Sequence, residues 1–190
     1  LIQQQASKLP TVAIQQTNAD ELLAALIAVW RSGKVAVLSS AKTFPSPVKR
    51  FSPANNTDAV NDLFGEIELP NDTEAPQLDA DLNQTALVIF TSGSSGTPTG
   101  IVKSFAQLDA EVALLEQHWG AKLNSSVFVS MVSRHHMFGL PFGLLWPVLR
   151  GNAVFTETVD YSESLETLAN TFSISLIASP VQLDKMPASL

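Results

Sequence analysis

An apolar run leads directly into a loop of glycines and small hydroxyl residues in the stretch Thr85-Ala-Leu-Val-Ile-Phe-Thr-Ser-Gly-Ser-Ser-Gly-Thr-Pro-Thr-Gly100. A short, continuous apolar run is typical of a buried strand, so we predict a strand over 85–90 and a polar loop over 91–100. Glycines let a backbone approach a ligand closely, and hydroxyls add hydrogen-bond donors. The residues alone therefore leave two interpretations open, a phosphate-binding loop and a plain surface turn.

Strand-like segments alternate with helical segments on both sides of this loop. Strands are predicted over 35–38, 127–132, 153–155 and 174–178, helices over 17–33, 104–120, 139–149 and 162–172, and a last helical turn after 179–180. Because crossover helices join parallel strands, this alternation predicts an α/β fold with a parallel sheet flanked by helices.

Local signals mark the ends of the predicted helices. We expect Thr17 to be the N-cap of the first helix and Gly33 to end it. Ser104 and Gln107 match a capping box for the second helix, and Pro147 should kink the third. The faces expected to be buried are Leu22, Leu23, Leu26, Ile27 and Trp30 in the first helix, and Leu108, Val112, Leu115 and Trp119 in the second.

The segment 39–84 has a different composition, rich in Pro, Asn, Asp and Thr, with one short helix candidate near 57–64. We interpret it as a polar, acidic excursion from the core. Its acidic residues lack the spacing of a cation-binding loop, which favours a solvated loop over a metal site.

Composition excludes several function classes. The 190 residues carry 11 basic and 18 acidic side chains, a net charge of −7, which argues against a nucleic-acid groove. The absence of cysteine excludes disulfides and thiolate catalysis and fits a cytoplasmic protein. No apolar run reaches the roughly 18 residues of a membrane span. Because the chain opens on Leu1 without a methionine, we expect it to be a piece of a longer protein.

The loop Thr91-Ser-Gly-Ser-Ser-Gly-Thr-Pro-Thr-Gly100 resembles the signature T-S-G-[ST]-T-G-x-P-K-G of the adenylate-forming enzymes, which include acyl-CoA and aryl-CoA synthetases. Eight of the ten positions agree. Downstream, Arg134-His-His-Met-Phe-Gly-Leu140 resembles the H-x-x-G element of that family, and 144–151 resembles the helix that follows it. By this resemblance, residues 1–190 form part of the N-terminal AMP-binding domain of such an enzyme.

The resemblance implies an ATP-dependent ligase that converts a small carboxylic acid into an acyl-adenylate and then into a thioester, as in fatty acid metabolism. It implies ATP and magnesium (Mg²⁺) as cofactors, coenzyme A or a carrier-protein thiol as acceptor, and an acyl carrier protein as a potential partner. By the same resemblance His136 is catalytic and lies near the acid pocket. The phosphate-binding residues would be Thr91, Ser92, Gly93, Ser94, Ser95, Gly96, Thr97, Thr99, Gly100 and Lys103.

Two departures from the family pattern bear on activity. Thr99 replaces the usual lysine, which removes a positive charge from the phosphate site, and Lys103 is either a substitute for it or a solvated charge. Nothing in the chain resembles the later G-Y-G-x-T-E and G-R-x-x-D elements or the C-terminal catalytic lysine. We therefore expect the 190-residue chain to be inactive by itself. The alternative is a non-catalytic phosphate- or partner-binding α/β domain that has lost ligase activity.

His135 and His136 are adjacent, so on an extended segment their side chains would point to opposite sides. Without cysteine, and with only His118 elsewhere, we expect no metal site. His136 either faces a ligand or caps the following helix, and Gly139 would permit a tight turn between them. Phe138 and Phe142, like Met137, would line an acid pocket or belong to the core.

Overall fold

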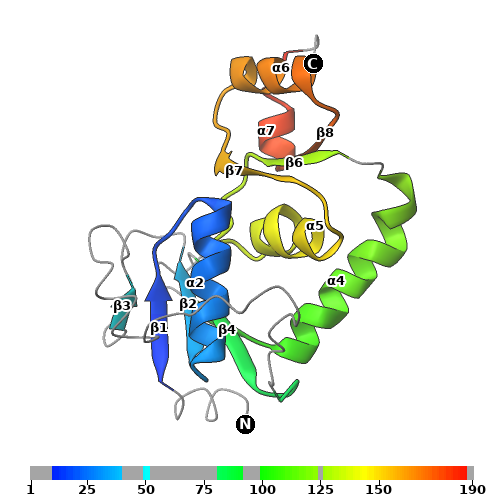
Figure 1. The fold of residues 1–190 in the computed structure, drawn as a ribbon. Coiled ribbons are helices and arrows are strands. Elements are labelled where there is room, and N and C mark those ends of the chain that lie inside the picture. The colour runs from blue at the N-terminus through cyan, green and yellow to red at the C-terminus, as the bar shows by residue number, and fades with distance from the viewer. Residues whose placement is uncertain (1–9, 40–48, 52–80, 92–98, 124–125, 188–190) are drawn as a thin grey trace, which may run out of the picture. The chain divides into compact units, whose positions relative to one another are not determined.

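The computed structural model describes residues 10–39, 49–51, 81–91, 99–123 and 126–187 (Figure 1). The chain divides into two compact units. The first unit comprises residues 1–16 and 24–106, and the second comprises residues 17–23 and 107–190.

The first unit contains a five-stranded sheet with the order β3-β1-β2-β4-β5. Its strands are β1 (Thr11–Ile14), β2 (Val35–Ser39), β3 (Lys49–Phe51), β4 (Thr85–Thr91) and β5 (Thr99–Ser104). The β1–β2, β1–β3 and β2–β4 pairs are parallel, in agreement with the predicted parallel sheet for β2 and β4, whereas β5 runs antiparallel to β4. All five residues of β2 are buried, in keeping with its central place. Neither β1 nor β3, which lies within the acidic excursion, was predicted from the sequence.

Helix α2 (Ala19–Arg31) buries an apolar stripe at helical spacing, formed by Leu22, Ala25, Leu26 and Val29. Two details of the prediction were wrong. The helix begins one residue later than expected, because Asn18 rather than Thr17 supplies the first helical carbonyl, to Leu22 N at 2.9 Å. Ile27 is exposed, since it lies outside the stripe.

Two other features of this helix region stabilise its end. Gly33 ends the helix with a φ of +67°, the left-handed conformation that glycine adopts without strain. Trp30 donates a hydrogen bond from Nε1 to the carbonyl of Ala86 on β4 at 2.9 Å. Its ring also meets Phe105 edge-on, with 5.4 Å between centroids.

The second unit contains a parallel three-stranded sheet with the order β7-β6-β8. Its elements are β6 (Val127–Ser130), the π-helix η2 (Pro141–Leu145), α5 (Trp146–Leu149), β7 (Val154–Thr158), α6 (Ser162–Thr171), β8 (Ile174–Ile177) and α7 (Pro180–Leu183). Helix α4 (Phe105–Trp119) and the short 3₁₀ turn η1 (Gly120–Lys122) precede them. Figure 1 shows α6 and α7 on one face of this sheet and α5 on the other.

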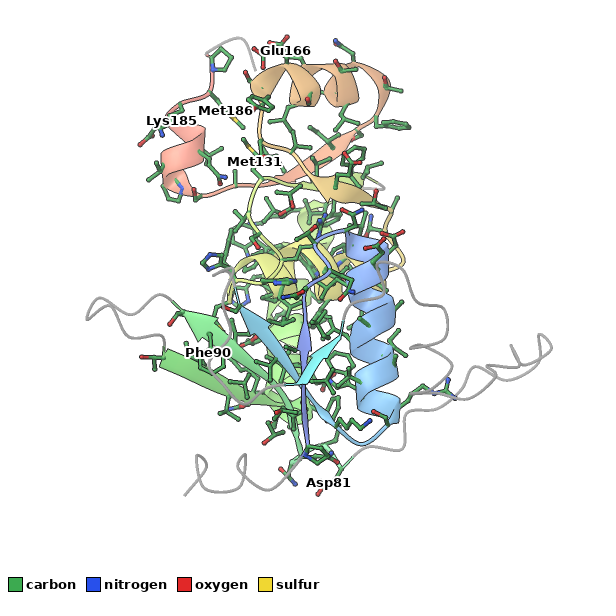
Figure 2. The ribbon with its side chains drawn as sticks, turned by 90° about the vertical axis from the view of Figure 1, so that its left-hand side faces the viewer. Asp81, Phe90, Met131, Glu166, Lys185 and Met186 are labelled. Atoms are coloured by element: carbon green, nitrogen blue, oxygen red, sulfur yellow. The ribbon has the colours of Figure 1, made fainter. Side chains whose placement is uncertain are left out.

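Strand alternation gives the sheet two apolar faces. On one face, Phe128 packs with Trp146 of α5 and with Ile177, and Val112 and Leu115 of α4 pack against this cluster. On the other face the buried cluster is Val129, Val159 and Leu165, and the two labelled methionines of Figure 2, Met131 and Met186, pack against it. The sheet of the second unit is therefore covered by helices on both faces, as predicted.

Helix α4 begins after Ser104, as the capping-box position predicted. Trp119 was expected to face the core, but it is exposed. Glu116 instead connects α4 to α5: its Oε2 accepts hydrogen bonds from Trp146 Nε1 and from Arg150 Nη1, both at 2.8 Å. The hydrogen bond from Trp146 is the largest cause that lowers the pKa of Glu116, and desolvation partly opposes it. The hydrogen bond and the charge of Arg150 lower this pKa further.

The predicted helix over 139–149 is distorted, as expected from Pro147, and the distortion takes the form of the π-helical turn η2. Proline has no N–H to donate to the carbonyl four residues earlier, which belongs to Gly143. That carbonyl instead accepts a hydrogen bond from Arg134 Nε at 3.2 Å. A side chain thus replaces the backbone donor that Pro147 lacks.

Candidate functional site

The predicted phosphate loop joins two antiparallel strands in the first unit. In the β4–β5 ladder, Thr91 pairs with Thr99 and Phe90 pairs with Gly100, and Thr91 Oγ1 lies 3.4 Å from the carbonyl oxygen of Thr99. The two described ends of the loop therefore meet at its base. The residues between them, Ser92, Gly93, Ser94, Ser95, Gly96, Thr97 and Pro98, lie outside the described part of the chain.

At this base the backbone of Gly100 lies close to two side chains of β4. A Cβ atom there would lie 3.1 Å from both Val88 Cγ1 and Phe90 Cε1, closer than ordinary van der Waals contact. The labelled Phe90 in Figure 2 marks this part of β4. The side chains of Phe90 and Val88 thus occupy the space next to the glycine backbone.

Lys103 lies four residues beyond Thr99 on β5 and is paired with Leu87. With a rise of about 3.3 Å per residue, this places Lys103 roughly 13 Å along the strand from Thr99. The distance favours the alternative in which Lys103 is not a phosphate ligand. Thr99, in the position of the family's usual lysine, is exposed.

In the second unit the chain turns sharply after β6. His136 N donates to the carbonyl of Ser133 at 3.1 Å, and His135 N donates to Ser133 Oγ at 3.2 Å. A Cβ on Gly139 would overlap the backbone carbonyl of Ser133, so only glycine fits there without a backbone shift. The prediction that Gly139 permits a tight turn is confirmed.

The two histidines lie on this turn and not on an extended segment, which corrects the prediction. His135 is buried, whereas His136 is half-buried and lines a cavity. The backbone carbonyl of His136 accepts the first helical hydrogen bond, from Leu140 N at 3.0 Å. Among the described residues, the imidazole ring of His136 has no hydrogen-bond partner. Its backbone therefore begins the helix while its ring remains available to a ligand.

The cavity has a volume of about 540 Å³ and lies where β6 and β8 end. Its lining residues are Met131, Val132, Ser133, His136, Phe138, Ser179, Pro180 and Gln182. The segment after β6 leads to the α5 face of the sheet, while the segment after β8 leads to Met186 on the α6 face. Adjacent parallel strands whose connections diverge in this way form a crevice at their carboxyl ends, where α/β proteins commonly bind ligands.

The other polar side chains of the cavity are engaged in fixing its walls. Ser179 and Gln182 form a capping box at the start of α7, in which Gln182 Oε1 accepts from Ser179 N at 2.8 Å and from Ser179 Oγ at 2.9 Å. Gln182 Nε2 donates to the carbonyl of Met131 at 2.7 Å. These contacts join the segments that follow β6 and β8.

A column of aromatic rings leads from the core to the cavity. Phe128 meets Trp146 edge-on, Trp146 meets Phe142, and Phe142 meets Phe138 with 4.6 Å between centroids. Phe142 packs against the core cluster, whereas Phe138 lines the cavity with 41% of its surface exposed. Of the two interpretations given from the sequence, core packing therefore applies to Phe142 and cavity lining applies to Phe138.

Arg134 is a residue whose role sequence reasoning missed. It is 1% exposed, and its guanidinium donates to the carbonyls of Phe155 at 2.6 Å, Thr156 at 3.0 Å and Gly143 at 3.2 Å, with Glu157 O at 3.5 Å. Burial lowers the pKa of Arg134, and the charge of Asp20 opposes that change. The sequence did contain one sign of this role, because Arg134 is the single charged residue in the apolar stretch 126–149.

Within the described ranges, no three or more histidine, cysteine or carboxylate side chains lie close enough together to hold a metal ion. Across the same ranges, no helix combines the length and the hydropathy needed to cross a bilayer.

A sequence profile described as "AMP-binding enzyme" matches residues 47–184, more than half of the chain. The chain belongs to this family. The resemblance to adenylate-forming enzymes is thereby confirmed.

Mitochondrial malonate–CoA ligase of Homo sapiens is 30% identical over 87 residues, covering 46% of this chain and 15% of the relative. Its counterpart in Xenopus laevis is 24% identical over 151 residues, covering 65% of this chain and 26% of the relative. The chain therefore spans about a quarter or less of these relatives.

Solved structures of the family share the fold. An ATP-bound MatB from Rhodopseudomonas palustris matches with a TM-score of 0.69 and 18% identity, covering 93% of this chain and 40% of that protein. An o-succinylbenzoate CoA synthetase from Bacillus subtilis, in complex with ATP and magnesium, matches with a TM-score of 0.66 and 18% identity, covering 95% and 55%. A malonyl-CoA ligase with methylmalonyl-CoA and AMP matches with a TM-score of 0.65 and 23% identity, covering 93% and 41%. These likenesses establish the α/β fold.

Proposed function

We propose that this chain is part of an ATP-dependent acid–thiol ligase. In the first step a carboxylate oxygen attacks the α-phosphorus of ATP, the bond from that phosphorus to the bridging oxygen breaks, and pyrophosphate leaves. In the second step the sulfur of a thiol attacks the acyl carbonyl, and AMP leaves with the oxygen it received. Family membership and the CoA-ligase activity named for the relatives support this reaction class.

The loop 91–100 is assigned to the phosphates of ATP. Thr91, Thr99 and Gly100 form its described base, and hydroxyl and glycine residues fill the remainder of its sequence. Hydroxyl and backbone donors can hold the departing pyrophosphate without a nucleophilic side chain. ATP fits this donor chemistry. The described residues contain no cluster of metal ligands, so we assign none to magnesium and derive no step through it.

His136 is assigned to the acid substrate. The observation that carries this assignment is its free imidazole in the cavity at the carboxyl ends of β6 and β8. An imidazole N–H can donate to one carboxylate oxygen and hold the acid in place. A hydrogen bond to a charged group is worth about 1.5–3 kcal/mol, so its loss should slow adenylation about 10- to 100-fold.

The test is acid-dependent exchange of labelled pyrophosphate into ATP, measured with the full-length protein. His136→Ala should lower this exchange by the stated factor. His118→Ala is the matched control, because the His118 ring is exposed on α4 and bonded to Leu114 O at 2.8 Å, away from the cavity lining. Equal exchange in both variants would refute the role of His136. Absence of exchange with every acid would favour the alternative, a binding domain that has lost activity. Thr99 supports this alternative, because it replaces the usual lysine of the family.

We also propose the finer features that the resemblance implies. Residues 1–190 would be part of the N-terminal AMP-binding domain of a cytoplasmic ligase with coenzyme A or a carrier-protein thiol as acceptor and a role in fatty acid metabolism. Because the chain carries no match to the later family motifs, the 190-residue chain should not turn over alone. Comparing exchange by the chain and by the full-length protein tests this directly.

A further inference from the structure

We infer that Arg134 is a positioning residue for the adenylation step, because its guanidinium ties the turn that carries His136 to a bulge in β7. This assignment rests on the proposed function, in which His136 contacts the acid. It goes beyond that function by giving the orientation of His136 to a side chain that is only 1% exposed and acts through its neighbours.

Strand β7 contains two more residues than β6 in the stretch where the two strands pair. Phe128 of β6 pairs with Val154 of β7. Two residues farther along β6, Ser130 pairs with Thr158, which lies four residues beyond Val154. The hydrogen bond from Val159 N to Ser130 O at 2.9 Å follows this insertion. Extra residues in one strand form a bulge, a feature that occurs next to active sites and can re-aim a side chain.

The carbonyls of this bulge meet the guanidinium of Arg134. Its Nη2 donates to Phe155 O at 2.6 Å and its Nη1 donates to Thr156 O at 3.0 Å. The third nitrogen, Nε, donates to Gly143 O in the π-helical turn η2 at 3.2 Å. The planar fork of an arginine can serve acceptors from two segments at once, which a single ammonium cannot do in the same geometry. Arg134 thus fixes β7 and η2 relative to its own backbone.

The backbone of Arg134 belongs to the turn that carries His136. Two peptide units separate these residues, so their Cα atoms lie within about 8 Å of each other. The turn has little room to absorb a shift, since His136 N donates to Ser133 O at 3.1 Å and a Cβ on Gly139 would overlap that same carbonyl. A displacement of the Arg134 backbone should therefore reach the imidazole of His136.

A purely structural role and a positioning role predict different couplings between Arg134 and His136. If Arg134 only stabilises the fold, its substitution lowers activity by the same factor with or without the imidazole of His136. If Arg134 acts through His136, its substitution loses most of its effect once that imidazole is removed. A double-mutant cycle measures this difference.

The cycle is measured with the full-length protein as kcat/KM for exchange of labelled pyrophosphate into ATP, with whichever of hexanoate, benzoate and malonate is exchanged fastest. We expect Arg134→Lys to lower kcat/KM about 10-fold in the native background, since a misplaced reacting group can cost about 100-fold. In the His136→Ala background the loss should be less than about twofold. Leu168→Ala is the matched control, because it weakens the packing of α6 against the buried cluster of the same unit and should act equally in both backgrounds.

Equal losses from Arg134→Lys in the two backgrounds, or no loss in either, would overturn the inference and leave the proposed function intact. If Arg134→Lys yields no folded protein, Gly143→Ala takes its place and the same outcomes decide, because the new Cβ would lie 3.1 Å from Ser130 Oγ and should shift the carbonyl that Arg134 holds. No loss in His136→Ala would overturn both the role of His136 and this inference. Absence of exchange with every acid would overturn the proposed ligase activity as well.

Discussion

Replacing Arg134 by methionine should destabilise the second unit more than replacing any exposed charged residue of that unit would. Methionine keeps much of the side-chain volume but removes the guanidinium, which leaves the carbonyls of Gly143, Phe155 and Thr156 without these donors. Pro147, whose position in an α-helix would bring its N–H to the Gly143 carbonyl, has no N–H to donate.

The magnitude follows from these contacts. Three hydrogen bonds between 2.6 and 3.2 Å involve a charged donor, and each is worth about 1.5–3 kcal/mol. Desolvation of the guanidinium, which is 1% exposed, offsets several kcal/mol of that sum. We therefore expect Arg134→Met to lower the free energy of unfolding by about 3–5 kcal/mol, and Arg134→Lys by an intermediate amount because one ammonium cannot serve three carbonyls in the fork geometry.

Urea unfolding followed by tryptophan fluorescence measures this change. A Trp30→Phe background leaves Trp119 and Trp146, both in the second unit, as reporters. Lys185→Met is the matched control, since Lys185 is an exposed basic residue of the same unit and exposed substitutions usually change stability little. A cost of Arg134→Met no larger than that of Lys185→Met, at an unchanged m-value, would refute this prediction.

Three further predictions test other parts of the structure. The fold lowers the pKa of Glu116, so the contribution of its carboxylate to stability is fully present above the ordinary value of 4.5 and is lost as the pH falls through the lowered pKa. The Tm of the native protein should therefore exceed that of Glu116→Gln at neutral pH, and the two Tm values should converge once the pH is below the lowered pKa of Glu116. Gly139→Ala should cost about 1–3 kcal/mol in urea unfolding because the methyl group meets Ser133 O, and a cost as small as that of an exposed glycine-to-alanine change would contradict the tight turn. Thr99→Lys should tighten pyrophosphate binding about 5- to 30-fold in calorimetry, equivalent to 1–2 kcal/mol, whereas Thr99→Gln should not, and equal binding by both would argue against a phosphate site.

Sequence patterns predicted the elements whose signal is local. The strands β2, β4, β6 and β8 are continuous apolar runs, and Gly33 and Ser104 mark helix ends by their backbone preferences. Strand β1 was missed although its four residues are mostly apolar and it is as long as β6 and β8. Strand β3 was missed because it lies in a polar segment and is defined by its pairing with β1. The antiparallel direction of β5 depends on the partner strand, which no local pattern specifies.

The candidate site divides in the same way. The glycine spacing indicated the loop, and Gly139 indicated the turn that presents His136. The contacts of Arg134 were not predictable, because its acceptors come from segments about ten and twenty residues away and become neighbours only when η2 and β7 pack together. The backbone bonds of His136 to Ser133 and Leu140 were likewise not predictable, because they form only in the folded turn.

If this family member activates an acid as its adenylate, an oxygen atom of the acid must pass to AMP, and isotope labelling can follow that atom. The full-length protein would be supplied with ATP, coenzyme A and a monocarboxylic acid labelled with heavy oxygen in its carboxylate. We expect AMP that carries one labelled oxygen, because the carboxylate attacks the α-phosphorus and the thiol later displaces AMP. Unlabelled AMP, or label recovered in inorganic phosphate alongside ADP, would contradict it.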